Sequence, residues 1–97
     1  MPVISRKKLH DFGGKHSAVK QELDVWYLMI TKNDYCNPNA IKIVFNSADI
    51  LPGDRIVFNI KGNSYRIIVK IRYSTQTMFI RFIGTHAEYD KVDVEKI

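Results

Sequence analysis

The sequence predicts an α+β domain, with helices in its first half and a small, mainly antiparallel sheet in its second. Before residue 32, apolar residues recur at three- and four-residue spacing, as they do on one side of a helix. After residue 54, three segments alternate apolar and polar residues and are separated by short loops, which is typical of antiparallel strands. We expect residues 1–97 to form one domain around one core.

The first half predicts an edge strand and two helices. Residues 2–4 are a short apolar entry, and Ser5 is expected to cap a helix from Arg6. Each glycine costs ~1 kcal/mol inside a helix, so Gly13-Gly14 should end or loosen it. Ser17 should cap a second helix over residues 18–31. Its apolar stripe is expected to cover the sheet and consists of Val19, Leu23, Trp26, Tyr27 and Ile30.

The middle of the chain predicts connections and one short helix. Residues 32–39 form a polar link, in which Asn37 or Asn39 is expected to cap a helix that runs to Phe45. Residues 46–49 and 51–54 are predicted loops, the second because Pro-Gly is a turn signal.

Residues 55–61, 64–73 and 77–84 are the three predicted strands. The loop Gly62-Asn63 should join the first two as a tight hairpin, and residues 74–76 should join the last two. One face carries the predicted apolar rows: Ile56, Phe58, Ile60; Tyr65, Ile67, Val69, Ile71, Tyr73; Met78, Ile80, Phe82. The other carries Arg55, Asn59 and Lys61; Arg66, Lys70 and Arg72; and Arg81. The apolar face should be buried and the basic face solvated.

The positive charge is concentrated on this sheet. The net charge is +5, of which +1 belongs to residues 1–54 and +4 to residues 55–97. From residue 55 to residue 87 there are six Lys or Arg and no Asp or Glu. Such a surface attracts a nucleic acid or an acidic protein.

The sequence does not support several other classes of protein or site. Cys36 is the only cysteine, so we expect no internal disulfide, no thiol catalysis and a reducing, cytoplasmic location. His10, His16 and His86 lack metal-ligand spacing, so we expect no metal and no other cofactor. No apolar run approaches the ~20 residues that span a bilayer, and the N-terminus lacks the apolar core of a signal peptide.

The basic face carries groups that suit RNA cleavage. Transesterification needs a base for the 2′-hydroxyl, cations near the phosphorus and an acid for the 5′ oxygen, and it requires no metal. Lys61, Arg66, Arg81, His86 and Tyr89 could supply these. The plainer alternatives are a capping His86, a packing Tyr89 and solvated charges at Arg55, Lys70 and Arg72. On the pattern alone, a nuclease and a non-catalytic basic binding module are equally supported.

Two runs resemble a known family. Residues 57–66, Val-Phe-Asn-Ile-Lys-Gly-Asn-Ser-Tyr-Arg, resemble the central strands of the HigB toxins, a branch of the bacterial RelE/ParE toxin superfamily. Residues 79–90, Phe-Ile-Arg-Phe-Ile-Gly-Thr-His-Ala-Glu-Tyr-Asp, resemble their last strand and C-terminal motif. Trp26-Tyr27 and residues 46–49 fit as well, so the resemblance covers essentially the whole chain.

The resemblance implies a RelE-like fold and an mRNA interferase. Such a toxin cuts mRNA in the ribosomal A site without a metal. It is neutralised by a helix-turn-helix antitoxin of the HigA type, and it meets operator DNA only within the antitoxin complex. The alternatives are a non-catalytic RNA-binding toxin, a ParE-like toxin that targets DNA gyrase, and a repressor subunit whose basic face binds an acidic antitoxin segment.

The resemblance also implies roles for residues. Lys61 would orient or activate the 2′-hydroxyl, and Arg66 and Arg81 would contact the phosphate. His86 would be the acid or base, since the unperturbed pKa of histidine is nearest neutrality. Tyr89 would stack on a base or position the phosphate. The predicted RNA-binding residues around them are Arg55, Asn59, Lys70 and Arg72.

Overall fold

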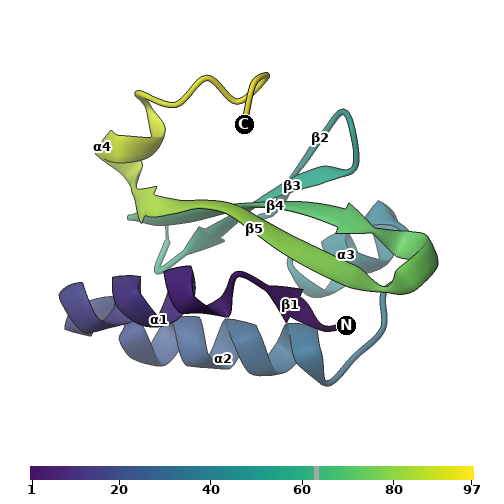
Figure 1. The fold of residues 1–97 in the computed structure, drawn as a ribbon, viewed down its shortest axis with the longest axis horizontal. Coiled ribbons are helices and arrows are strands. Elements are labelled where there is room, and N and C mark those ends of the chain that lie inside the picture. Colours follow the sequence, from purple (N-terminus) through teal and green to yellow (C-terminus); the bar gives the residue numbers. More distant parts are fainter. Residues whose placement is uncertain (63) are drawn as a thin grey trace.

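The computed structural model describes residues 1–62 and 64–97, and Asn63 of the predicted hairpin loop lies outside the described residues. Its fold is α+β, with a five-stranded mixed sheet in the order β1-β5-β4-β3-β2 (Figure 1). The strands are β1 (Val3–Ile4), β2 (Asp49–Leu51), β3 (Arg55–Ile60), β4 (Tyr65–Arg72) and β5 (Thr77–Thr85). Only the β1–β5 pair is parallel among the described pairs.

The helices are α1 (Arg6–Lys15), α2 (Lys20–Thr31), α3 (Pro38–Val44) and the single turn α4 (His86–Tyr89), with 3₁₀ turns η1 (Ser17–Val19) and η2 (Tyr73–Thr75). In Figure 1, α1 and α2 lie below the sheet, while α4 and the segment after it lie above. Leu23, Trp26 and Ile30 of α2 are buried in one core with apolar residues of β3, β4 and β5, and the Trp26 ring meets the Phe58 ring edge-on, with centres 5.3 Å apart. The two faces of the sheet therefore have different surroundings.

The first helix differs from the prediction. It runs through both glycines to Lys15, and Gly13 is buried. A Cβ at Gly13 would lie at ordinary contact distance from α2, 3.5 Å from Lys20 Cγ and 3.9 Å from Leu23 Cδ1, so packing in the folded chain overrides the low helix propensity of glycine there. The helix begins at Arg6 with Ser5 at the N-cap position, as predicted, but Ser5 has a left-handed φ of 71° and its side chain makes no capping hydrogen bond.

Of the next two predicted helix starts, the first is wrong and the second is confirmed. Ser17 does not cap α2. It begins the turn η1, and α2 starts at Lys20. Asn37 caps α3 as predicted, because its side chain accepts a hydrogen bond of 2.9 Å from the Ala40 N–H. A proline at the first helical position reinforces this start, since its missing N–H would have no partner there.

The predicted loops at residues 46–49 and 51–54 are partly wrong. Asp49–Leu51 forms the edge strand β2, which pairs antiparallel with the first half of β3. Three residues are too few for the alternation of a strand to be recognised in the sequence, and pairing with a neighbour decides the outcome.

The third strand also differs from simple alternation. Ile80 pairs with Val69 and Phe82 pairs with Ile68, so Arg81 is an extra residue and β5 contains a bulge. A bulge reverses the face on which the following residues lie. Phe82 therefore belongs to the basic face, and Ile83, opposite Ile67, packs against the core.

The basic face is less solvated than expected. Val57 and Ile68 lie on it, outside the main core cluster, yet both are fully buried. The segment after α4 passes over this side of the sheet (Figure 1). It is attached there by Arg55, whose guanidinium donates hydrogen bonds to the carbonyls of Pro52 and Val94.

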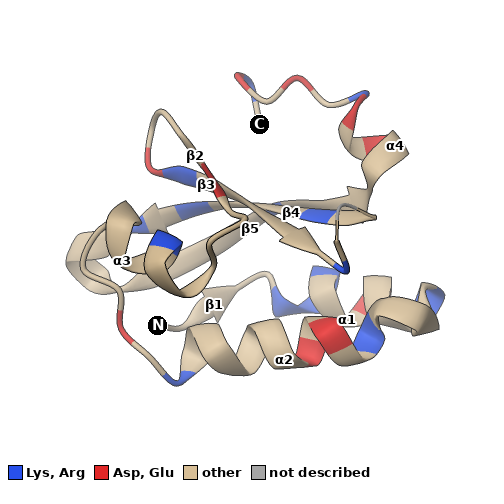
Figure 2. Ribbon diagram, turned by 180° about the vertical axis from the view of Figure 1, so that it is seen from behind, with Lys and Arg blue, Asp and Glu red and all other residues tan. Residues whose placement is uncertain are grey.

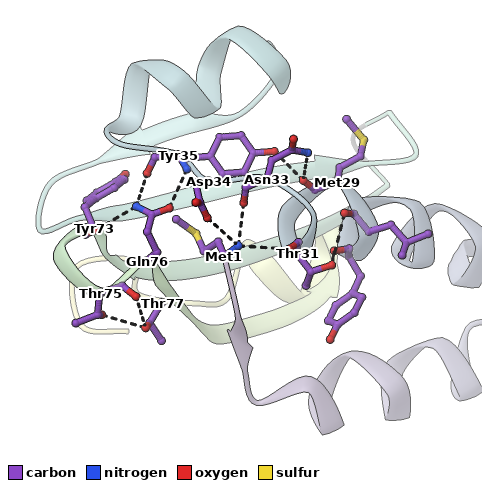
Figure 3. Close-up of polar contacts among 12 residues, drawn as sticks. Met1, Met29, Thr31, Asn33, Asp34, Tyr35, Tyr73, Thr75, Gln76 and Thr77 are labelled. Atoms are coloured by element: carbon purple, nitrogen blue, oxygen red, sulfur yellow. Dashed lines mark hydrogen bonds and ion pairs between the residues drawn. The ribbon is translucent and has the colours of Figure 1, made fainter.

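A polar cluster ties the N-terminus and the β4–β5 connection to the end of α2 (Figure 3). The Met1 amine donates to the carbonyl of Asn33 at 2.8 Å. Gln76, at a left-handed φ of 52°, accepts from the Tyr35 N–H at 2.9 Å. Its amide nitrogen donates to the carbonyls of Tyr35 at 2.8 Å and Tyr73 at 3.1 Å. One side chain thus satisfies three backbone groups in two segments.

Gln76→Ala should lower the free energy of unfolding by about 1–3 kcal/mol, since it leaves partly buried backbone groups of Tyr35 without partners. Urea unfolding followed by Trp26 fluorescence would measure this. Gln21→Ala, on the exposed side of α2, is the matched control and should change stability by less than about 0.5 kcal/mol. Equal effects of both substitutions would contradict the assigned role of Gln76.

The ionisation of Tyr73 should lower the free energy of unfolding at alkaline pH. Burial, together with the negative charge of Asp54, raises the pKa of the Tyr73 phenol to about 12. A raised folded-state pKa contributes stability that is present below the unfolded value of 10.0 and is lost as the pH rises toward 12. Tyr73→Phe should therefore lose less stability than the parent between pH 10 and 12.

At neutral pH the same substitution should be neutral or stabilising by about 1 kcal/mol, because the buried hydroxyl has no hydrogen-bond partner among the described residues. Urea unfolding at several pH values compares the two proteins. A Tyr73→Phe variant that weakens in parallel with the parent would contradict this origin of the alkaline loss.

Candidate nucleic-acid interface

Six of the nine predicted site residues fall into two groups on the basic face of the sheet. One group surrounds α4, at the start of β4 and the end of β5, and contains Arg66, His86 and Tyr89. The other lies along the middle of the sheet and contains Arg81, Lys70 and Arg55. Gly84 is opposite Arg66, so Arg81, three residues earlier, lies roughly 10 Å away along β5.

A capping box fixes the start of α4. The Thr85 hydroxyl accepts from the Glu88 N–H at 3.2 Å, and the Glu88 carboxylate accepts from the Thr85 N–H at 2.9 Å. The His86 N–H also donates to the carbonyl of Ser64 at 3.0 Å, which ties α4 to the β3–β4 hairpin. These bonds place the side chains of His86 and Tyr89 at the end of the sheet.

The capping box lowers the pKa of the Glu88 carboxyl. Hydrogen bonds from the backbone and side chain of Thr85 hold the pKa of Glu88 below its ordinary value, and the charges of His16 and Lys91 contribute less. Although the family resemblance covers Glu88, it was not among the predicted site residues. Threonine followed three residues later by glutamate is the sequence signal that could have identified this role.

Arg66 and Tyr89 are in direct contact. The guanidinium carbon of Arg66 lies 4.5 Å from the centre of the Tyr89 ring, the geometry of a cation–π interaction. The Phe82 ring lies beside the Tyr89 ring, with their centres 6.4 Å apart. Arg66 Nε is buried and has no acceptor among the described residues. The guanidinium therefore contacts the Tyr89 ring, and none of the described carboxylates forms an ion pair with it.

His86 is paired with Asp90. Nδ1 of the ring lies 3.1 Å from the Asp90 carboxylate, one helical turn further along. Such a pair fixes the ring's orientation and leaves Nε2 for chemistry. Sequence reasoning did not select Asp90, although its spacing from His86 was the available signal.

His16 is a second imidazole near this end of the sheet. Its ring stacks on Phe12, with centres 4.2 Å apart, and meets Tyr65 at 5.9 Å. Tyr65 is opposite Thr85, so the end of α1 reaches the start of α4. Sequence reasoning did not place His16 here, because no local pattern relates residue 16 to residue 65.

Lys61 points elsewhere. It has a left-handed φ of 52°, and its ammonium donates to the carbonyl of Ala18 in η1 at 3.3 Å. Among the described contacts, none joins Lys61 to Arg66, His86 or Tyr89. The side chain is exposed and flexible, so a bound ligand would have to draw it from η1.

The middle of the basic face is a wide hollow. Arg55, Lys70 and Arg81 line an open space of about 480 Å³ together with Glu95 and Lys96 of the last residues. Arg72 lies at the far end near Asp54. Asn59 is engaged, since its amide donates to the carbonyl of Ser47. Of the described sheet cations, Lys70, Arg72 and Arg81 are exposed, and none forms an ion pair with a carboxylate. Figure 2 marks Lys and Arg along the ribbon of the sheet in blue.

Other kinds of site receive no support from the described residues. The described residues contain no group of three or more His, Cys, Asp or Glu side chains that could hold a metal ion. Cys36 is free and exposed. None of the described helices has the length and apolar character needed to cross a membrane.

Comparison with known proteins identifies the family. Residues 19–92 match the model of the HigB toxin family, described as the RelE-like toxic component of a toxin–antitoxin system. The chain is a member of the HigB toxin family. The match ends just after α4, so it includes both groups of basic residues and the capping box.

Relatives in the HigB family agree. The chain is 34% identical over 92 residues to the "mRNA interferase toxin HigB" of Escherichia coli K12, which covers 93% of this chain and 88% of the relative. The "mRNA interferase HigB" of Shigella flexneri gives the same figures. That of Escherichia coli O6:H1 is 27% identical over 94 residues, which covers 95% and 91% of the two chains.

Thr85→Ala should remove the cap of α4 and destabilise that turn by about 0.5–2 kcal/mol. Faster amide exchange at Glu88 and Tyr89 would report it. Thr85→Ser keeps the hydroxyl and is the matched control, so exchange there should stay near that of the parent. Equal exchange in all three proteins would contradict the capping role.

The stability that the capping box gives to α4 should also depend on pH. Because the pKa of Glu88 is lowered, its contribution to α4 is present above the ordinary value of 4.5 and is lost as the pH falls through the folded-state pKa. The chemical shift of the Thr85 N–H should follow this titration. In Glu88→Gln, whose amide does not ionise, the acid-dependent change should disappear.

Proposed function

We propose that this HigB toxin is an endoribonuclease that cuts mRNA, as the names of its relatives state for those proteins. The observation that carries the proposal is the group at α4. An arginine in contact with a tyrosine ring, and a histidine with a carboxylate partner three residues before that tyrosine, lie at one end of the basic sheet face. These are the groups that a phosphodiester needs for attack by its own 2′-hydroxyl.

The proposed reaction is a transesterification. The 2′ oxygen loses its proton and attacks the phosphorus, the bond to the 5′ oxygen breaks, and that oxygen takes up a proton. A 2′,3′-cyclic phosphate and a 5′-hydroxyl result, so atoms and charge balance without water, metal or other cofactor.

We propose the following roles for the site residues, in line with the family resemblance. Asp90 holds Nδ1 of His86, so Nε2 is the atom that exchanges a proton as acid or base. Arg66 and Arg81 stabilise charge on the phosphate, and Tyr89 stacks on a base or positions the phosphate. Lys61 orients or activates the 2′-hydroxyl after it leaves the carbonyl of Ala18. Arg55, Asn59, Lys70 and Arg72 bind the RNA strand.

We infer that cutting depends on the ribosome. The basic hollow is open and broad, so it can attract RNA without fixing one phosphate beside His86. Catalytic groups act efficiently only on a held substrate, and alignment contributes several orders of magnitude to the rate. A translated mRNA in the ribosomal A site, next to 16S rRNA, would supply that alignment.

The remaining features of the proposal come with the family. We take residues 1–97 as one cytoplasmic toxin domain of RelE-like fold, with two N-terminal helices on a mainly antiparallel sheet. Its partner is a helix-turn-helix antitoxin of the HigA kind, and operator DNA is bound only through that complex. The basic face suits an acidic antitoxin segment as well as RNA.

Primer extension on a reporter mRNA after brief induction tests the function. New 5′ ends should appear within translated codons. They should vanish for His86→Ala and Arg81→Ala, with growth arrest lost and far-UV circular dichroism unchanged, because each variant removes a group that acts on the phosphate. Ile43→Ala, on the exposed surface of α3, is the control that should cut normally.

A reporter without its start codon separates the mechanisms. Ends that persist on this untranslated RNA would contradict ribosome dependence. Growth arrest without any new ends would instead indicate a non-catalytic or gyrase-targeting toxin. Full toxicity of both variants would show that the site is misplaced.

A further inference from the structure

We propose that Phe82 is a positioning residue of this site, which holds Tyr89 against Arg66 and requires glycine at position 84. The inference rests on the proposed function and adds to it two residues that the chemistry itself does not call for. Neither touches the reacting atoms. Phe82 would act only through Tyr89 and Arg66.

The bulge in β5 brings the Phe82 ring to the site. Because Arg81 is an extra residue, Phe82 lies opposite Ile68 on the basic face. Two residues further on, Gly84 lies opposite Arg66 on the same face. Without the bulge, Phe82 would point into the core and Tyr89 would have no ring beside it.

Tyr89 needs such support because α4 is short. A helix of four residues is marginal by itself, and the hydrogen bonds of the capping box join only Thr85 and Glu88, not the Tyr89 side chain. Tyr89 is its last residue. Its ring contacts the Arg66 guanidinium at 4.5 Å, and the Phe82 ring lies 6.4 Å from it at an angle of 59°. These two side chains are its described ring contacts.

Gly84 provides the space for the Phe82 ring. A Cβ at Gly84 would lie 2.6 Å from Cζ and 3.2 Å from Cε2 of Phe82, and 3.3 Å from the Cβ of Glu88. The first distance is shorter than van der Waals contact allows, so the ring covers the glycine directly. Gly84 is not among the positive-φ residues, so the requirement is for room and not for an unusual backbone.

The arrangement matters because Arg66 Nε has no acceptor among the described residues. An arginine that carboxylates hold in place is already neutralised, whereas one held by rings keeps its charge for a phosphate. The Phe82–Tyr89 pair would therefore set the direction of the Arg66 guanidinium before the RNA arrives.

The test measures Arg66 directly. Its Nε–H resonance, assigned by its loss in Arg66→Lys, should be shifted by the Tyr89 ring above it. Phe82→Ala and Gly84→Ala should both move this resonance, and Phe82→Leu should move it less. Phe79→Ala removes the same ring from the same strand, away from Tyr89, and should leave the resonance in place.

Cleavage of mRNA-programmed ribosomes completes the test. Phe82→Ala and Gly84→Ala should lower kcat on the order of tenfold, with KM changed less than about twofold, because alignment and not binding is lost. Phe82→Leu should recover part of kcat. The double variant Gly84→Ala/Phe82→Ala should be no slower than Phe82→Ala, since the new methyl group then has room.

Each result has one meaning. An unmoved Arg66 resonance in Phe82→Ala overturns the inference, whatever the cleavage rate. Normal kcat in Phe82→Ala overturns it too, if Arg66→Ala and Tyr89→Ala have lost cleavage. Full cleavage by those two variants overturns the proposed site and this inference with it. A moved resonance with reduced kcat, unchanged KM and a non-additive double variant supports it.

Discussion

Burial of the sheet's apolar rows under α2 is the constraint on which the rest of the molecule depends. Trp26 packs edge-on against Phe58, and the neighbouring apolar residues of β3, β4 and β5 are buried with it. When one face of a strand is buried in the core, the alternate residues of that strand lie on the opposite face. The cations of β3 and β4 are collected there for that reason.

Sequence patterns predicted much of this, because periodicity reports which side of an element is buried. The three strands, the second helix and the basic face follow from alternation and helical spacing, and the Asn37 cap follows from local chemistry. The family resemblance selected Arg66, His86 and Tyr89, which α4 and β4 bring to one end of the sheet. The functional roles of these residues stay predictions.

What the sequence could not supply depends on contacts between distant segments. Gly13-Gly14 continues a helix although glycine has a low helix propensity, and the burial of Gly13 beside Lys20 and Leu23 is a tertiary contact that propensity does not include. Asp49–Leu51 becomes a strand only through its pairing with β3. The inward position of Ile83 and the outward position of Phe82 require knowledge of the bulge, and His16 meets Tyr65 only in the folded chain.

Because of the bulge, the number of residues in β5 decides which side chains lie on the basic face. Between Ile80 and Phe82, one added residue exchanges the inside and outside of everything that follows on β5, from Phe82 to Thr85. A relative that lacks a residue here would place a different row of β5 side chains on the basic face. In comparisons among such toxins, a one-residue gap at this position therefore carries more information than many substitutions, because it changes which side chains share a face.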